Sequence, residues 1–248
     1  MLTTERHALL LSRLQTEGRL VAGELAAALG LSEDTIRRDL RDLAAEGLLT
    51  RVHGGALPAS PTHRPLARRA TLEPEAKRRL ARRGAALVRD GMTVLVDGGT
   101  TNLLLVQALP PGLVCTIVTH SPTIAAATEA LPAVEVILLG GRIFRHSMVA
   151  LGADTAEALA RVNADLLFLG VTGVHPQAGL TTGDHEEARM KARMIARAGD
   201  CVVLATPDKI GTASAFSVAP LTALAALIVA GGPDPAAWLP EAVGVIRA

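Results

Sequence analysis

Short apolar runs alternate with helix-like segments beyond residue 90, and this alternation constrains the fold more than any other feature. The runs favour strands, and the segments between them place apolar residues at helical spacing. The pattern predicts an α/β fold, a mainly parallel sheet covered by helices. The expected strands are residues 92–97, 113–119, 134–139, 164–171, 201–205 and 224–230, and the expected helices are residues 101–109, 122–130, 153–160 and 185–198.

The core of this sheet must be built from aliphatic side chains. Hydrophobic residues make up 49% of the 248-residue chain, whereas aromatic residues make up 2% and tyrosine is absent. No apolar run approaches the ~20 residues that cross a bilayer, and the first residues lack the pattern of a signal peptide. Cys115 and Cys201 lie far apart and predict neither a disulfide framework nor a metal motif. We therefore expect a cytoplasmic protein with no membrane partner.

The net charge of +1 hides an uneven distribution that divides the chain into three regions. Residues 1–56 carry seven Arg and eight Asp or Glu, whereas residues 57–83 carry eight Lys or Arg and two Glu. Three prolines within residues 57–65 are typical of a linker, and Pro74 begins a helical pattern. The predicted organisation is a small domain of residues 1–56, a Pro- and Arg-rich linker of residues 57–73, and a larger domain of residues 74–248.

The small domain shows the order of a helix-turn-helix. Apolar spacing predicts helices over residues 5–16 and 21–29, and Gly30 suits a left-handed C-terminal cap. Ser32 is a natural N-cap for a third helix, which ends at Gly47. A short strand over residues 48–52 and the turn His53-Gly54-Gly55 then predict a wing. Two helices joined by Gly-Leu-Ser, the second beginning with small polar residues, form the arrangement that enters the DNA major groove.

Arginines on the third helix suit contacts with phosphates or guanine. Ile36, Leu40 and Leu43 form the buried stripe, so Arg37 and Arg38 lie mostly on other faces. Small hydroxyl residues at the helix start allow close approach to base edges. The alternative interpretation is that this charge run is only a solvated, salt-bridged helix surface.

The segment LSEDTIRRDLRDLAAEGLLTRVHGGA resembles the N-terminal winged helix-turn-helix of the DeoR family of bacterial transcription regulators. The resemblance rests on Ser32, the run from Thr35 to Leu40, Arg51 and the His-Gly-Gly turn. It implies an operator-DNA partner contacted by Thr35, Arg37 and Arg38. The candidate DNA-binding residues are Ser32, Thr35, Arg37, Arg38, Arg41, Arg51 and His53.

Polar residues follow the predicted strands of the larger domain, where ligands of parallel sheets bind. Gly98, Gly99, Thr100 and Thr101 follow Asp97 at the start of a helix, a setting that favours an anion such as phosphate. Basic residues and carboxylates at the other strand ends would complete a sugar-phosphate site. The candidate effector-binding residues are Asp97, Gly98, Gly99, Thr100, Thr101, Gly141, Arg142, Glu187, Lys191, Asp208 and Lys209.

Each of these signals has a structural alternative. A Gly-Gly-Thr-Thr turn is often only a tight strand-helix connection, and Glu187 with Lys191 can be a plain i,i+4 pair worth ~0.3–0.5 kcal/mol. The sequence contains neither a Walker loop nor Gly-x-Gly-x-x-Gly after a strand, so we expect no nucleotide cofactor. The histidines show no metal-ligand spacing.

The strand-end motifs, in their order along the chain, are similar to those of the DeoR sensor domain. The fold of that domain resembles ribose-5-phosphate isomerase. Members of the family typically bind phosphorylated sugars or related metabolites. Two positions depart from the family pattern: Thr206 stands where an aspartate is common, and His120 where an asparagine is frequent. Both positions are expected near the pocket.

Three functions remain open at this point. The first is a repressor of a sugar-metabolism operon controlled by a phosphorylated effector. The second is a sugar-phosphate isomerase-like enzyme with an accessory DNA-binding domain, for which Asp97, Glu187 and Asp208 are candidate bases. The third is a protein-interaction module with a degenerate pocket. One winged domain makes few operator contacts, so the first function predicts a homodimer or homotetramer.

Overall fold

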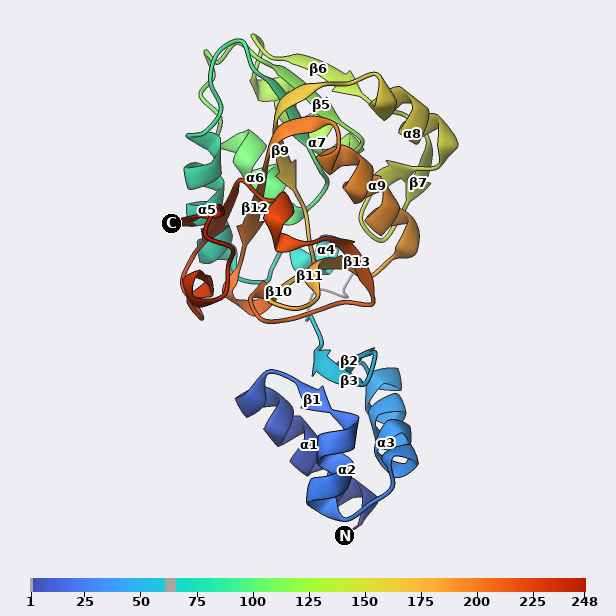
Figure 1. Cartoon of the computed structure of the whole chain (residues 1–248). Coiled ribbons are helices and arrows are strands. Elements are labelled where there is room, and N and C mark those ends of the chain that lie inside the picture. The colour runs from blue at the N-terminus through green and yellow to red at the C-terminus, as the bar shows by residue number, and fades with distance from the viewer. Residues whose placement is uncertain (1, 61–65) are drawn as a thin grey trace.

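The computed structural model describes residues 2–60 and 66–248, arranged as a small N-terminal domain beside a larger one (Figure 1). The interpretation of residues 61–65 as part of a linker lies outside the described residues. Among the helices of the described part, none combines the length and hydropathy needed to cross a membrane. The small domain consists of α1 (Thr3–Glu17), β1 (Leu20–Val21), α2 (Ala22–Leu29), α3 (Glu33–Ala45), β2 (Leu49–Val52) and β3 (Gly55–Pro58).

The expected winged helix-turn-helix is confirmed, with a larger sheet than the pattern predicted. β3 pairs antiparallel with both β1 and β2, so Gly55 belongs to a strand and not to the turn. A Cβ on Gly55 would lie 1.8 Å from the carbonyl oxygen of Leu20, which explains the glycine by the close approach of β1. Regular structure therefore extends to Pro58, two residues past the expected boundary.

Helix α3 is built as its sequence predicts. The Ser32 hydroxyl accepts a hydrogen bond from the Thr35 N–H at 3.2 Å and caps the helix. Ile36, Leu40 and Leu43 are at most 2% exposed and pack into one core with residues of α1, α2 and the small sheet. Burial of this stripe turns the opposite side of α3 outward.

The larger domain contains a seven-stranded sheet in which all neighbours are parallel, as expected. Its strand order is β15-β14-β12-β9-β4-β5-β6. The strands are β4 (Thr93–Val96), β5 (Thr116–Thr119), β6 (Glu135–Leu138), β9 (Ala164–Leu169), β12 (Ala198–Ala205), β14 (Ala226–Val229) and β15 (Gly244–Arg247). The chain moves from β4 towards β6 and then returns to the other side of β4 with β9. The topological switch point therefore lies between β4 and β9.

Helices cover both faces of this sheet (Figure 1). Leu80 of α5 and Leu105 of α6 belong to one apolar core, and Leu159 of α8 and Met194 of α9 to the other. The central strands β4 and β9 are buried along most of their length, as in a parallel sheet covered on both faces, whereas all four residues of the edge strand β6 are exposed. The helices of this domain are α4 (Leu66–Arg69), α5 (Pro74–Ala85), α6 (Thr100–Gln107), α7 (Pro122–Ala127), α8 (Ala153–Ala160) and α9 (His185–Ile195), with short 3-10 turns at Thr128–Ala130, Pro207–Lys209, Leu221–Ala223 and Pro235–Ala237.

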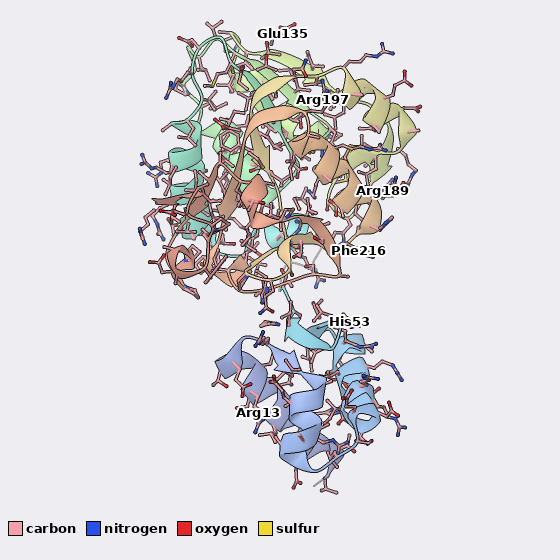
Figure 2. All side chains as sticks on the ribbon, viewed as in Figure 1. Arg13, His53, Glu135, Arg189, Arg197 and Phe216 are labelled. Carbon is pink, nitrogen blue, oxygen red and sulfur yellow. The ribbon has the colours of Figure 1, made fainter. Side chains whose placement is uncertain are left out.

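Several elements were not predicted from the sequence. A hairpin and a small antiparallel sheet lie outside the main sheet, the latter in the order β10-β11-β13. Their strands are too short to show a period: β7 (Arg142–Phe144), β8 (Val149–Leu151), β10 (Gly173–His175), β11 (Gly179–Thr182) and β13 (Phe216–Ala219). In Figure 2 Phe216 lies on the side of the large domain that faces the winged domain, whereas Glu135 lies at the far end.

The two domains touch through hydrogen bonds to the main chain of Ala213. Ala59 forms a parallel bridge with Ala213, whose N–H donates to the carbonyl oxygen of Pro58 at 3.0 Å. The carbonyl oxygen of Ala213 accepts the Ser60 N–H at 3.2 Å and the Thr50 hydroxyl at 2.9 Å. The segment after β3 is thus paired to a loop of the larger domain.

Candidate functional site

The predicted DNA-binding side chains lie on the outer side of the winged domain. Arg37 is 54% exposed and forms an ion pair of 2.6 Å with Glu33. The hydroxyls of Ser32 and Thr35 lie 2.9 Å apart at the start of α3. Arg38, Arg41, Arg51 and His53 are also exposed. By helical spacing, the arginines of α3 lie opposite the buried stripe, so this surface is open to a duplex.

A buried carboxylate on α3, which the sequence patterns did not predict, supports the arginine-bearing helix. Asp39 is 2% exposed and contacts Arg6 and His7 of α1, the latter at 3.2 Å. The hydrogen bond from Arg6 holds the pKa of Asp39 below its ordinary value. Asp39 thus ties α3 to α1 and orients the arginine face. Its spacing of three from Ile36 already placed it on the buried side of the helix.

A cavity lies at the switch point between β4 and β9. Its walls come from the loops that follow these two strands, the start of α9, the turn after β12, and α4 and α5. Among the predicted effector residues, those on its wall are Gly98, Gly99, Thr100, Thr101, Glu187, Lys191, Asp208 and Lys209. The structure therefore brings together eight residues that the sequence proposed from separate strand ends.

Asp97 lies behind this wall and not on it. The carboxylate is fully buried and accepts hydrogen bonds from Gly98 N–H at 2.7 Å, Gly170 N–H at 2.9 Å and the Lys191 ammonium at 2.6 Å. The His120 Nε2 atom lies 2.8 Å from the same carboxylate. With both oxygens engaged, Asp97 has no capacity for an effector hydroxyl or for a proton taken from a substrate. It is a positioning residue that joins the β4 loop, the β9 loop and α9.

The charges around Asp97 favour its ionised form. Burial alone would raise the pKa of Asp97, but Lys191 and His120 outweigh it and hold the pKa far below its ordinary value. Burial lowers the pKa of Lys191, whereas Asp97 and Glu187 raise it, and the net shift is upward. The predicted Glu187–Lys191 pair is long, at 4.0 Å, so the main partner of Lys191 is Asp97.

The loop after Asp97 leaves backbone donors at the start of α6. Gly99, at the N-cap, has φ +136°, a conformation that a residue with a side chain rarely adopts. No side chain caps this helix among the described residues. The first N–H groups of a helix without a cap suit an anion, and Thr100 and Thr101 begin α6 on the cavity wall.

The structure does not bring Gly141 and Arg142 to the cavity. Arg142 is 66% exposed and forms an ion pair with Glu186 on the surface. The neighbouring Gly140 carbonyl accepts a hydrogen bond from Thr155 at 2.7 Å, which fastens this segment to α8. Arg142 begins β7, whose last residue, Phe144, does line the cavity, but neither Gly141 nor Arg142 lies on its wall.

Asp208 and Lys209 present charges to the cavity from the turn after β12. Among the described residues, the Oδ1 atom of Asp208 is buried without a hydrogen-bond partner. Burial lowers the pKa of Lys209 to about 8, an effect that Asp208 opposes and the Arg69, Lys77 and Lys191 cations reinforce. Thr206, at the departure position, is 1% exposed and also contacts the cavity.

Two family models match this chain. One, described as the DeoR C terminal sensor domain, matches residues 72–230. The other, the DeoR-like helix-turn-helix domain, matches residues 6–62. The chain belongs to the DeoR family.

Relatives of this DeoR-family chain are named as transcription regulators. The HTH-type transcriptional regulator GlpR of Haloferax volcanii is 35% identical over 221 residues, covering 88% of this chain and 86% of the relative. The glycerol-3-phosphate regulon repressor of Escherichia coli K12 is 30% identical over 212 residues, covering 85% and 84%. The chain is accordingly a DNA-binding transcription regulator and not an isomerase.

Among solved structures, ribose 5-phosphate isomerase A from Methanocaldococcus jannaschii shares 17% identity with the DeoR-family chain. The alignment covers 55% of this chain and 54% of the isomerase, with a TM-score of 0.41.

Two residues on the cavity wall of this DeoR-family chain were not predicted from the sequence. Arg69 and Lys77 line the cavity, although Arg69 lies in the predicted linker and Lys77 in the helical pattern that Pro74 begins. His120, expected near the pocket, is 2% exposed and lies behind the cavity wall, where its Nδ1 atom is 2.8 Å from the carbonyl oxygen of Ala150 and its Nε2 atom is 2.8 Å from Asp97.

Proposed function

We propose that this DeoR-family regulator is a repressor of a sugar-metabolism operon, and that a phosphorylated sugar or related metabolite in the cavity controls it. The observation that carries the proposal is the combination, in one chain, of an exposed arginine face on α3 and a cation-lined cavity at the switch point. The name of the glycerol-3-phosphate regulon repressor supports the phosphorylated effector. Acting on operator DNA, the protein would work in the cytoplasm.

In the proposed complex, α3 enters the major groove. Thr35 and Arg37 lie near the helix start, where side chains approach base edges. Arg38 and Arg41 extend the same exposed side and suit phosphates. Arg51 and His53, on β2 and its turn, would contact the backbone beside the groove. Ser32 holds the helix start and contributes its hydroxyl.

A second copy of the chain is part of the proposal. A single small DNA-binding module buries only ~600–1,000 Å², and specific operator recognition commonly needs more. We expect a homodimer or homotetramer whose winged domains bind repeated half-sites. An effector can then release DNA by favouring an arrangement that spaces the winged domains wrongly, provided that it binds the two arrangements with different affinity.

The cavity offers two kinds of group to a sugar phosphate. Lys209 and the α6 start can bind the phosphate. Glu187 and the unpartnered Oδ1 atom of Asp208 can accept hydrogen bonds from sugar hydroxyls. A ligand with one anionic end and several hydroxyls would therefore pair with the donors and acceptors on the cavity wall.

Band-shift assays with DNA from upstream of the protein's own operon test the DNA half of the proposal. Thermal-shift screening against triose, pentose and hexose phosphates, with the unphosphorylated sugars as matched controls, tests the effector half. We expect a specific shift at physiological salt that one phosphorylated sugar reverses. No specific shift with or without ligand contradicts the regulator; equal stabilisation by the unphosphorylated sugar contradicts the phosphate requirement.

A further inference from the structure

Strand β6 leaves one edge of the seven-stranded sheet open. Among the described residues it pairs only with β5, and it stands last in the strand order of the sheet. Three successive aliphatic side chains of β6 are exposed: Val136 is 37% exposed, Ile137 43% and Leu138 49%. Because successive side chains of a strand point to opposite faces, apolar surface lies on both faces of this edge. The edge is at the end of the sensor domain remote from the winged domain (Figure 1).

The main chain of β6 also directs hydrogen-bonding groups away from the sheet. The N–H groups of Glu135 and Leu139 both donate to main-chain carbonyl oxygens of the segment that contains β5, at 2.9 and 2.8 Å. Alternate residues of a strand direct their N–H and C=O groups to opposite sides. Val136 and Leu138 therefore present theirs to the open edge. Such an edge is a template for pairing with another strand.

The opposite edge of the sheet carries a protection that most of β6 lacks. β15 ends in Arg247, which is exposed and forms an ion pair of 2.7 Å with Asp234, and its two aliphatic residues are half-buried. Charged side chains on an edge strand oppose pairing with another chain. The charged residue of β6, Glu135, accepts a hydrogen bond from the Thr116 hydroxyl on the β5 side at 3.2 Å. The three aliphatic residues that follow it are therefore left without a charge that would keep another strand away.

A second copy of the chain fits this edge by symmetry. A two-fold axis at Ile137 in an antiparallel pair of β6 strands sets Val136 of each copy opposite Leu138 of the other, so that both use their outward N–H and C=O groups. The two Ile137 side chains then meet at the axis, on one face of the joined sheet. In this register Glu135 lies near the end of the pair and away from its counterpart, which avoids like charges directly opposite each other.

We propose that β6 pairs antiparallel with β6 of a second copy, so that the two sheets become one continuous sheet across the dimer. The inference goes beyond the proposed function, which needs a second copy of the chain but names no surface for it. Pairing at β6 leaves the arginine face of α3 uncovered in both copies, because Glu135 lies at the end of the molecule away from the winged domain (Figure 2).

Single cysteines test the register of the pair in the full chain. Residues that face each other without hydrogen bonds in an antiparallel pair have Cα atoms about 4.5 Å apart, within reach of a disulfide. We expect Ile137→Cys to form a covalent dimer on oxidation, as measured by non-reducing electrophoresis. Glu135→Cys, about 13 Å from its counterpart in this register, should remain uncross-linked. The unaltered chain is the background control, since Cys115 and Cys201 are buried.

Sedimentation velocity over a range of concentrations measures the pairing without a cross-link. A strand of four residues buries less than the about 800 Å² per partner of a standard interface, so we expect a dimer that dissociates on dilution. Ile137→Lys sets two ammonium groups against each other at the axis and should raise the dimer Kd by about 10- to 100-fold. Leu138→Pro removes an outward N–H without removing a bond to β5, and should also raise the Kd. Leu48→Lys, at a residue of the winged domain that is 45% exposed, makes the same change of charge and should leave the Kd within about 2-fold.

Thermal unfolding identifies the variants that fold, and Ile137→Lys keeps the test decisive if the proline variant does not. A Kd that is unchanged in folded Ile137→Lys overturns the proposal, as does an equal rise in Leu48→Lys. Absence of a cross-link in Ile137→Cys, or equal cross-linking of Glu135→Cys, also overturns it. An unaltered chain that sediments as a monomer at every concentration would refute the pairing and leave the edge to a different protein. Operator band shifts are measured separately: absence of a specific shift refutes the proposed function, whatever the mass of the protein in solution.

Discussion

The Thr50 hydroxyl, in strand β2 of the winged domain, donates a hydrogen bond of 2.9 Å to the carbonyl oxygen of Ala213 in the sensor domain. Ala213 follows Lys209 by four residues, and the Gly211 N–H between them donates to the Val174 carbonyl oxygen at 2.8 Å. A short, hydrogen-bonded loop therefore runs from the effector cavity to the strands of the wing. We infer that this loop carries part of the coupling between the two sites.

Replacing Thr50 with Val should weaken the effector response more than it weakens the fold. The Ala213 carbonyl oxygen keeps the Ser60 N–H as a donor, so we expect a loss of at most about 1 kcal/mol in the free energy of unfolding. The effector concentration needed for half-release of operator DNA should change, as measured by fluorescence anisotropy. Thr50→Ser retains the hydroxyl and should behave like the unaltered chain. Identical release curves for all three proteins would exclude this contact from the coupling.

Arg37→Ala should weaken operator binding by ~1–3 kcal/mol if Arg37 reads a base. Discrimination against a mutated operator should then decrease as well. If Arg37 touches only phosphates, specificity should survive and the slope of log affinity against log salt should fall by about one. Arg83→Ala, on the exposed side of α5, is the matched control because it removes one charge from the sensor. Operator affinity that falls equally in both variants would argue against a role for the α3 face.

Asp97→Asn should destabilise the sensor domain by about 3–5 kcal/mol, because it leaves the buried Lys191 ammonium without its main partner. The folded-state pKa of Asp97 is far below the ordinary ~3.9 of an unfolded aspartate. Its stabilising contribution is thus fully present above about pH 4 and is lost as the pH falls further. Urea unfolding at pH 7 and pH 3 measures both effects. Asp200→Asn, on an exposed residue of β12, should be nearly neutral; comparable losses in the two variants would show that burial of the pair is not the cause.

Effector affinity should fall as the pH rises through about 8. Burial lowers the pKa of Lys209 to about 8, and a bound anion raises it again by favouring the ammonium form. Binding therefore takes up a proton above pH 8 and none well below it. A phosphate monoester is already dianionic in this range, since its second pKa is ≈ 6, so its own titration does not mimic the effect. Calorimetry at pH 7, 8 and 9 measures this pH dependence of effector affinity. Lys209→Met should bind the effector more weakly and show no such dependence. An unchanged pH dependence in that variant would assign the titration to another group.

Local patterns in the sequence were sufficient to predict the winged domain and the parallel sheet. Ser32 caps α3, and Ile36, Leu40 and Leu43 are buried, because capping and helical spacing depend on residues only a few positions apart. The small strands β7, β10 and β11 escaped prediction because three or four residues show no period. The Gly-Gly-Thr-Thr loop was found because parallel strand ends converge on one edge of a sheet.

Roles within the cavity depended on contacts between distant segments. Asp97, expected to face a sugar hydroxyl, is enclosed by Lys191, His120 and two backbone N–H groups. Arg142 and Arg69 carry the same charge, yet Arg142 is paired at the surface and Arg69 lines the cavity. Amino-acid order decides which side of a helix or strand is apolar. The packing of α4 and α5 against the sheet decides which charged side chains lose water and hydrogen-bond partners. Those are the charged side chains that can recognise a ligand.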